Sequence, residues 1–136
     1  MKIFLDTNIL IDWLDKRPGF EEAQLIIESN EKDDFTRVYT SFLSIADIAY
    51  IMRKKPREDI LEIIKALTHN INILPSDDSI LHRLDEFKSP DIEDCMQIKC
   101  AEMWDCDTII TNNTSHFLGY TDIPVMTAQE FVSMCG

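Results

Sequence analysis

Acidic side chains interrupt apolar stretches of this 136-residue chain, at places where a folded core does not require them. Asp6 follows the apolar residues that open the chain, and Asp47 lies within a second apolar stretch. Asp91, Glu93 and Asp94 crowd a third segment. Carboxylate oxygens are the ligands that Mg²⁺ and Mn²⁺ prefer, and a metal held by them can activate water for attack on a phosphodiester. We therefore predict that Asp6, Asp47 and Asp94 are catalytic and hold Mg²⁺ or Mn²⁺.

Each of these acids also has a purely structural explanation. Asp6 is suited to cap the N-terminus of a following helix, and Ser44 with Asp47 has the spacing of a short capping box. The acids around Asp94 also suit a helix N-terminus, where negative charge is favoured by the helix dipole. Several carboxylates at one end of a sheet repel one another unless a cation neutralises them, so their combination favours the metal interpretation.

Short apolar stretches alternate with segments of helical periodicity along the chain. Strands are expected at residues 2–6, 38–41, 71–74, 108–111 and 124–126. Helices are expected at residues 8–15, after Pro18, at 44–55, after Pro56, at 76–87, at 91–103 and after Thr127, where Thr127 and Glu130 match a capping box. This alternation predicts a three-layer α/β/α sandwich around a short, mostly parallel sheet, built as one domain over residues 1–136.

In open α/β sheets, ligands bind beyond the carboxyl ends of the strands. Asp6 ends the first expected strand, and Asp47 falls in the first turn of the helix after the second. Asp94 falls in the first turn of the helix before the fourth strand, which Asn113 and His116 follow. The topology is therefore expected to bring these residues to one edge of the sheet.

The charge balance limits how the protein can bind nucleic acid. The formal net charge is −12, which opposes broad electrostatic binding of DNA or RNA. Arg53, Lys54 and Lys55 form the one dense basic segment, and with His116 they are candidate phosphate contacts. The alternative is that these cations interact favourably with the dipole at a helix C-terminus and that His116 is an ordinary loop residue.

The chain has no stretch that predicts a membrane span or a secretion signal, so we expect a cytoplasmic protein. Its four cysteines lack CxxC spacing and are expected to stay reduced. There is no phosphate-binding glycine loop and no nucleophile elbow, which argues against nucleotide-cofactor enzymes and serine hydrolases.

Four segments resemble, in the same order, the motifs of PIN domains (PilT N-terminus), a family of metal-dependent nucleases. They are LDTNIL at residues 5–10, SIADIAY at 44–50, DIEDCMQ at 91–97 and the segment from DTIITNN to Phe117. The resemblance implies an α/β/α fold and a Mg²⁺ or Mn²⁺ site with Asp6 and Asp94 as primary ligands. Asp47 stands where many members have the longer Glu.

The resemblance also implies auxiliary roles for Glu93, Asn8 and Asn113 beside the metal. The fourth segment departs from the family pattern, because Asn112 replaces the usual Arg and His116 replaces the usual Asp. This departure implies a single metal or weakened activity.

Many single-domain bacterial members of this size are ribonuclease toxins of VapC-type toxin–antitoxin pairs. The leading hypothesis is therefore a metal-dependent endoribonuclease that acts on RNA, forms a homodimer and is neutralised by an antitoxin protein. The alternative is a catalytically degenerate PIN-fold module that binds a protein or RNA without cleavage. A third hypothesis, phosphotransfer with Asp6 as nucleophile, requires a second acid at the position of Asn8.

Overall fold

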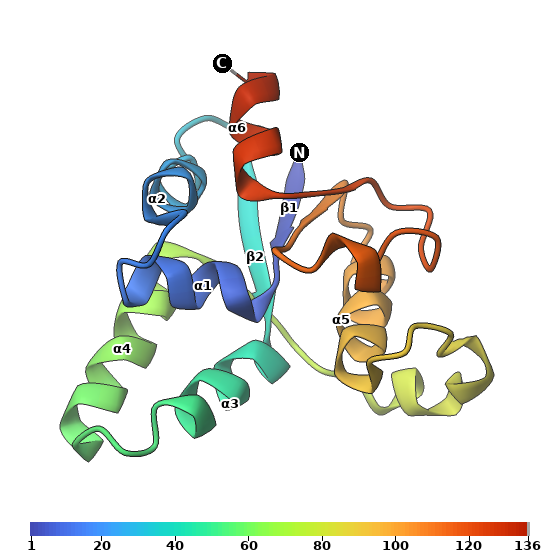
Figure 1. Ribbon diagram of the computed structural model, residues 1–136, viewed down its shortest axis with the longest axis horizontal. Helices are drawn as coiled ribbons and strands as arrows, with labels where there is room; N and C mark the ends of the chain where they lie inside the picture. The colour runs from blue at the N-terminus through green and yellow to red at the C-terminus, as the bar shows by residue number, and fades with distance from the viewer. Residues whose placement is uncertain (136) are drawn as a thin grey trace.

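The computed structural model describes residues 1–135, and its centre is a five-stranded parallel sheet (Figure 1). The strands are β1 (Lys2–Leu5), β2 (Arg37–Ser41), β3 (Asn72–Leu74), β4 (Thr108–Ile110) and β5 (Val125–Met126). They are arranged in the order β3-β2-β1-β4-β5, and every neighbouring pair is parallel. The central strand β1 pairs Phe4 with Tyr39 on one side and with Ile109 on the other.

Helices cover both faces of this sheet, which confirms the predicted α/β/α architecture. They are α1 (Thr7–Leu14), α2 (Phe20–Glu28), α3 (Phe42–Ile51), α4 (Arg57–Asn70), α5 (Ile92–Met103) and α6 (Ala128–Cys135). Figure 1 shows α5 on one side of the strands, with α1, α2 and α4 on the other.

The residues of β1 alternate between two hydrophobic cores. Ile3 and Leu5 pack with residues of α1, α2, α3, α4 and α6, whereas Phe4 packs with residues of α5 on the opposite face. All three side chains are almost fully buried. A strand covered on both faces needs apolar residues at every position, which explains the uninterrupted apolar sequence before Asp6.

The helix predicted at residues 76–87 is wrong. This segment forms two short 3₁₀-helices, η1 (Asp78–His82) and η2 (Leu84–Glu86). Asp77 caps the first by accepting a hydrogen bond from the backbone N–H of Ser79. Ile80 packs in the core and Phe87 packs against it, but Leu81 and Leu84 between them remain exposed. Packing therefore does not stabilise one continuous helix over this segment.

The start of α3 also differs from the prediction. Ser41, not Ser44, is the N-cap, because the Ser41 hydroxyl accepts a hydrogen bond from the backbone N–H of Ser44. Asp47 therefore lies in the second turn of α3, and the predicted capping box with Ser44 is wrong. Dipole compensation in a first turn no longer explains the acid at this position.

The capping box at the C-terminal helix is confirmed, since Thr127 and Glu130 exchange side-chain to backbone hydrogen bonds. Within residues 1–135, no helix is long and apolar enough to cross a membrane.

The four cysteines are free thiols, and all except Cys135 are buried. Burial raises the pKa of Cys100 to about 11 and the pKa of Cys106 to about 12. These two side chains therefore stay protonated and unreactive at neutral pH.

Candidate metal centre

Asp6 directly follows β1 at the carboxyl edge of the sheet and is 4% exposed. Its Oδ1 accepts a hydrogen bond of 2.8 Å from the backbone N–H of Thr7, so it caps α1 as its structural explanation required. Its Oδ2 accepts from the Thr111 hydroxyl at 2.8 Å and from the Asn8 amide at 3.2 Å. Burial, with smaller contributions from the charges of Asp94 and Asp47, raises the pKa of Asp6 from 3.8 to about 6, although the hydrogen bonds from Thr111 and Thr7 act in the opposite direction.

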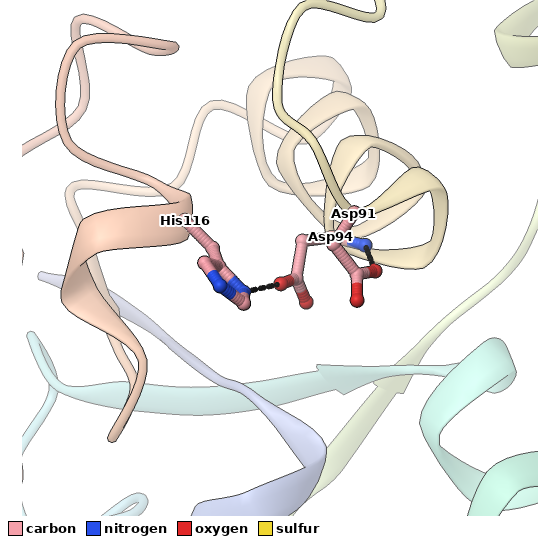
Figure 2. Close-up of side chains that lie close together, drawn as sticks. All are labelled: Asp91, Asp94 and His116. Atoms are coloured by element: carbon pink, nitrogen blue, oxygen red, sulfur yellow. Dashed lines mark hydrogen bonds and ion pairs between the residues drawn. The ribbon is translucent and has the colours of Figure 1, made fainter.

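Asp94 lies in the first turn of α5 and is also buried. Its Oδ2 lies 2.9 Å from Nδ1 of His116, which ends the short 3₁₀-helix η3 (Thr114–His116) after β4. Asp91 caps α5, and its Oδ1 accepts a hydrogen bond of 2.9 Å from the backbone N–H of Asp94. Figure 2 shows the three side chains pointing toward one another from α5 and η3. Burial raises the pKa of Asp94, while the contact with His116 acts in the opposite direction.

Asp47 faces Glu93 across the gap between α3 and α5. Proton sharing with the Asp47 carboxyl group, together with burial, raises the pKa of Glu93 to about 8. The charges of Asp91 and Asp6 also raise it, so Glu93 belongs to the same acid cluster. Asp47 Oδ2 is buried and has no hydrogen-bond partner within the described part of the chain.

These observations fit a divalent cation. The structure brings Asp6, Asp47, Glu93 and Asp94 together at the edge where the sequence predicted them, and their charges act on one another. A buried carboxylate oxygen without a donor is destabilising in the absence of a compensating charge. The four acids offer only oxygen donors, which suit Mg²⁺ or Mn²⁺. Ligand atoms of Asp91, Asp94 and His116, one from each residue, lie within 4.8 Å of one another at the same cluster.

A buried polar network beneath the acids was missed in the sequence. The Gln97 side chain is fully buried; its Nε2 donates to the Ser44 hydroxyl at 2.7 Å, and its Oε1 accepts from the Ser41 hydroxyl at 2.6 Å. The Thr7 hydroxyl donates to Ser44 Oγ at 2.9 Å. The network therefore joins α1, α3 and α5.

Each of these contacts lies next to an acid of the candidate site. Thr7 is adjacent to Asp6 in the chain, while Ser44 and Gln97 are each three positions from an acid on the same helix. Residues three apart share a helix face, so the network fixes the relative placement of the three carboxylates. The sequence did contain a signal for this network: polar residues lie three positions from an acid within apolar helical stretches.

Gln97→Leu is expected to lower the free energy of unfolding by about 2–3 kcal/mol, because it leaves buried hydroxyl groups without their amide partner. Chemical denaturation measures the effect. Gln24→Leu is the matched control, since the Gln24 amide makes its hydrogen bond to Glu28 at the surface of α2. The control is expected to change stability by less than about 0.5 kcal/mol. Equal effects of the two substitutions would contradict the role given to Gln97.

The remaining predicted site residues occupy different positions. Asn8 contacts the acids directly through Asp6, and its Oδ1 accepts from the backbone N–H of Asn112. Asn113 contributes backbone contacts, donating from N–H to Thr111 Oγ1 and accepting from His116 N–H. The Asn112 amide instead donates to Asp12 on α1 at 2.8 Å.

The basic segment lies outside the acid cluster. Arg53, Lys54 and Lys55 follow the C-terminal end of α3 and are exposed. Arg53 donates to the carbonyl of Tyr50 and stacks 4.1 Å from the centre of its ring. By the rise of an α-helix, the segment is displaced from Asp47 by about 9 Å or more along α3. This position agrees with the alternative explanation of the basic segment, in which its cations interact favourably with the dipole at the helix C-terminus.

The chain belongs to the PIN domain family, whose model matches residues 3–118. The match covers all four segments named above. The resemblance found in the sequence is thereby confirmed. A comparison with curated protein sequences finds none that matches the chain.

Solved structures share the fold at low sequence identity. A VapBC-1 structure from nontypeable Haemophilus influenzae has a TM-score of 0.71 at 22% identity and covers 95% of this chain and 99% of that chain. A toxin–antitoxin complex from Klebsiella pneumoniae has a TM-score of 0.67 at 24% identity and covers 93% and 97%. VapBC2 from Rickettsia felis, bound to a DNA fragment from the VapBC2 promoter, has a TM-score of 0.68 at 16% identity with the same coverage.

Proposed function

We propose that this protein is a metal-dependent endoribonuclease that hydrolyses RNA phosphodiesters. The observation that carries the proposal is the convergence of Asp6, Asp47 and Asp94 at the carboxyl edge of the sheet, with Asp47 Oδ2 buried and unpaired in the described residues. Membership of the PIN domain family supports the same reading, because PIN nucleases generally use divalent metal ions.

Asp6, Asp47 and Asp94 are the proposed ligands of Mg²⁺ or Mn²⁺. When bound, the cation would neutralise charge on the phosphate and lower the pKa of a water molecule. The chain itself orients the Asp6 carboxylate through Thr7 and Thr111. The raised pKa of Glu93 favours a proton shared between its carboxyl group and that of Asp47 when no cation is bound.

Asn8 and Asn113, the two proposed auxiliary amides, have different roles at the site. Asn8 orients Asp6, and the Asn113 side chain is proposed to orient water or RNA beside the cluster. The displaced position of Arg53, Lys54 and Lys55 limits them to phosphates of the RNA away from the cleaved bond.

The proposed partners follow from the family and from charge. The similar solved structures are of VapBC proteins or of a toxin–antitoxin complex, so we propose that an antitoxin protein binds this chain. A net charge of −12 favours a basic partner. A homodimer, a single domain over residues 1–136 and a cytoplasmic location are proposed as well.

A second function is favoured by the fourth motif. The His116 ring contacts Asp94 Oδ2 directly, and the Asn112 side chain donates a hydrogen bond to Asp12. If these changes prevent catalysis, the chain is a PIN-fold module that binds RNA or protein without cleavage. The phosphotransfer hypothesis has no structural support, because Asn8 supplies an amide donor to Asp6 where that chemistry needs a second acid.

Incubation of the purified protein with single-stranded and structured RNA, in Mg²⁺, Mn²⁺ or EDTA, tests the proposal. The expected result is cleavage in either metal and none in EDTA. A folded protein that leaves RNA intact in all conditions, while retaining it in a binding assay, would instead establish the non-cleaving module.

A further inference from the structure

His116 sets this acid cluster apart from one built of carboxylates alone. One ligand atom from each of Asp91, Asp94 and His116 can be chosen so that all three lie within 4.8 Å of one another. We propose that these three residues form a mixed oxygen–nitrogen site that selects a transition metal ion such as Mn²⁺ or Co²⁺ over Mg²⁺. The inference rests on the metal-binding part of the proposed function, with which these three residues share Asp94, and it specifies the metal bound at that side of the acid cluster.

The spacing of the side chains suits a shared ion. Two ligand atoms about 2.1 Å from one cation lie about 3 Å apart when they are adjacent in an octahedral site. His116 Nδ1 and Asp94 Oδ2 are 2.9 Å apart. Figure 2 shows these two atoms facing each other, with the Asp91 carboxylate on the other side of Asp94. An ion that bridges them would replace their direct contact.

The protein backbone holds all three residues in place. Asp91 and Asp94 are at the N-cap and in the first turn of α5, and the Asp91 Oδ1 to Asp94 N–H hydrogen bond leaves the second Asp91 oxygen available. His116 is fixed by the η3 turn, where its N–H donates to the Asn113 carbonyl at 2.9 Å. The next residue, Phe117, is fully buried and anchors this turn in the core. Ligands positioned in this way lose little conformational freedom on binding an ion.

The chemistry of the donors sets the preference. Mg²⁺ takes oxygen ligands and retains much of its hydration shell, whereas imidazole nitrogen suits transition metals. Of the three residues, His116 alone offers a nitrogen donor, so the preference depends on this one side chain. The competing explanation is a simple His116–Asp94 ion pair, which predicts no dependence of metal preference on His116.

Metal binding to the full chain, measured by calorimetry with Mn²⁺ and Mg²⁺ separately, tests the inference without using RNA cleavage. The wild-type protein is expected to bind Mn²⁺ at least about tenfold more tightly than Mg²⁺. His116→Asp is expected to reduce this ratio by about tenfold. His82→Asp, at an exposed histidine of η1, is the matched control and is expected to leave the ratio unchanged.

A second measurement needs no variant. Substoichiometric Mn²⁺ added to the wild-type protein is expected to broaden the NMR ring resonances of His116 before those of His69 and His82. Broadening of all three together, or an unchanged metal ratio in His116→Asp, would overturn the inference. The expected metal preference without RNA cleavage would support the site and refute the nuclease. Absence of metal binding to the folded protein would refute both.

Discussion

Asp6→Asn is expected to reduce metal-dependent cleavage of RNA by at least about a hundredfold. The substitution removes the charge of the proposed metal ligand at the end of β1, and metal ions contribute several kcal/mol of charge stabilisation in such reactions. It preserves the fold, since Asn caps a helix as well as Asp does. The Thr111 hydroxyl can also accept a hydrogen bond from the new amide instead of donating one. Initial rates of RNA cleavage at fixed Mn²⁺ concentration measure the effect.

Asp94→Asn is expected to have a similar effect from the opposite side of the cluster. Asp59→Asn, an identical chemical change at an exposed position of α4, is the matched control and is expected to retain the full rate. Cleavage that persists in both Asp6→Asn and Asp94→Asn would show that the nuclease is a contaminant. The assignment of the acids would then have no support.

The location of the acids was predictable because it depends mainly on chain order. Residues that follow parallel strands meet at one edge of the sheet whatever the details of packing, and this was sufficient for Asp6 and Asp94. The alternation of apolar strands and helices was likewise sufficient to predict the α/β/α architecture. Asp47 was placed near the correct edge but one turn too early, because two serines in its helix fit the cap equally well in the sequence.

Other features depend on packing between distant segments. The buried network around Gln97 requires α1, α3 and α5 to be in contact, and nothing in a single periodic pattern specifies that contact. The 2.9 Å contact between His116 and Asp94 joins the end of η3 to the first turn of α5. The error at residues 76–87 has the same origin, since helical periodicity predicts an apolar face without showing whether a partner covers it.

The metal-free protein is expected to lose stability as the pH rises from about 5 to about 8. The pKa of Asp6 is raised from 3.8 to about 6, and that of Glu93 from 4.5 to about 8. The folded state therefore binds more protons than the unfolded state in this interval, and the free energy of unfolding falls with pH. For the buried Asp6, the difference between its folded and unfolded pKa values corresponds to roughly 3 kcal/mol once the pH exceeds 6.

Chemical denaturation in EDTA at pH 5, 6, 7 and 8 measures this loss. Exposed acids with lowered pKa values, such as Asp33 and Asp77, are already ionised throughout this interval and leave its slope unchanged. Asp6→Asn is expected to flatten the profile between pH 5 and 7, because the variant no longer has the buried ionisable group. Mn²⁺ is expected to restore the stability of the wild-type protein at pH 8 by more than that of the variant, since the cation compensates the carboxylate charges that the rise in pH exposes. Parallel pH profiles for the two proteins in EDTA would show that Asp6 ionises as an ordinary carboxylate, which would remove the electrostatic argument for a cation at this edge of the sheet.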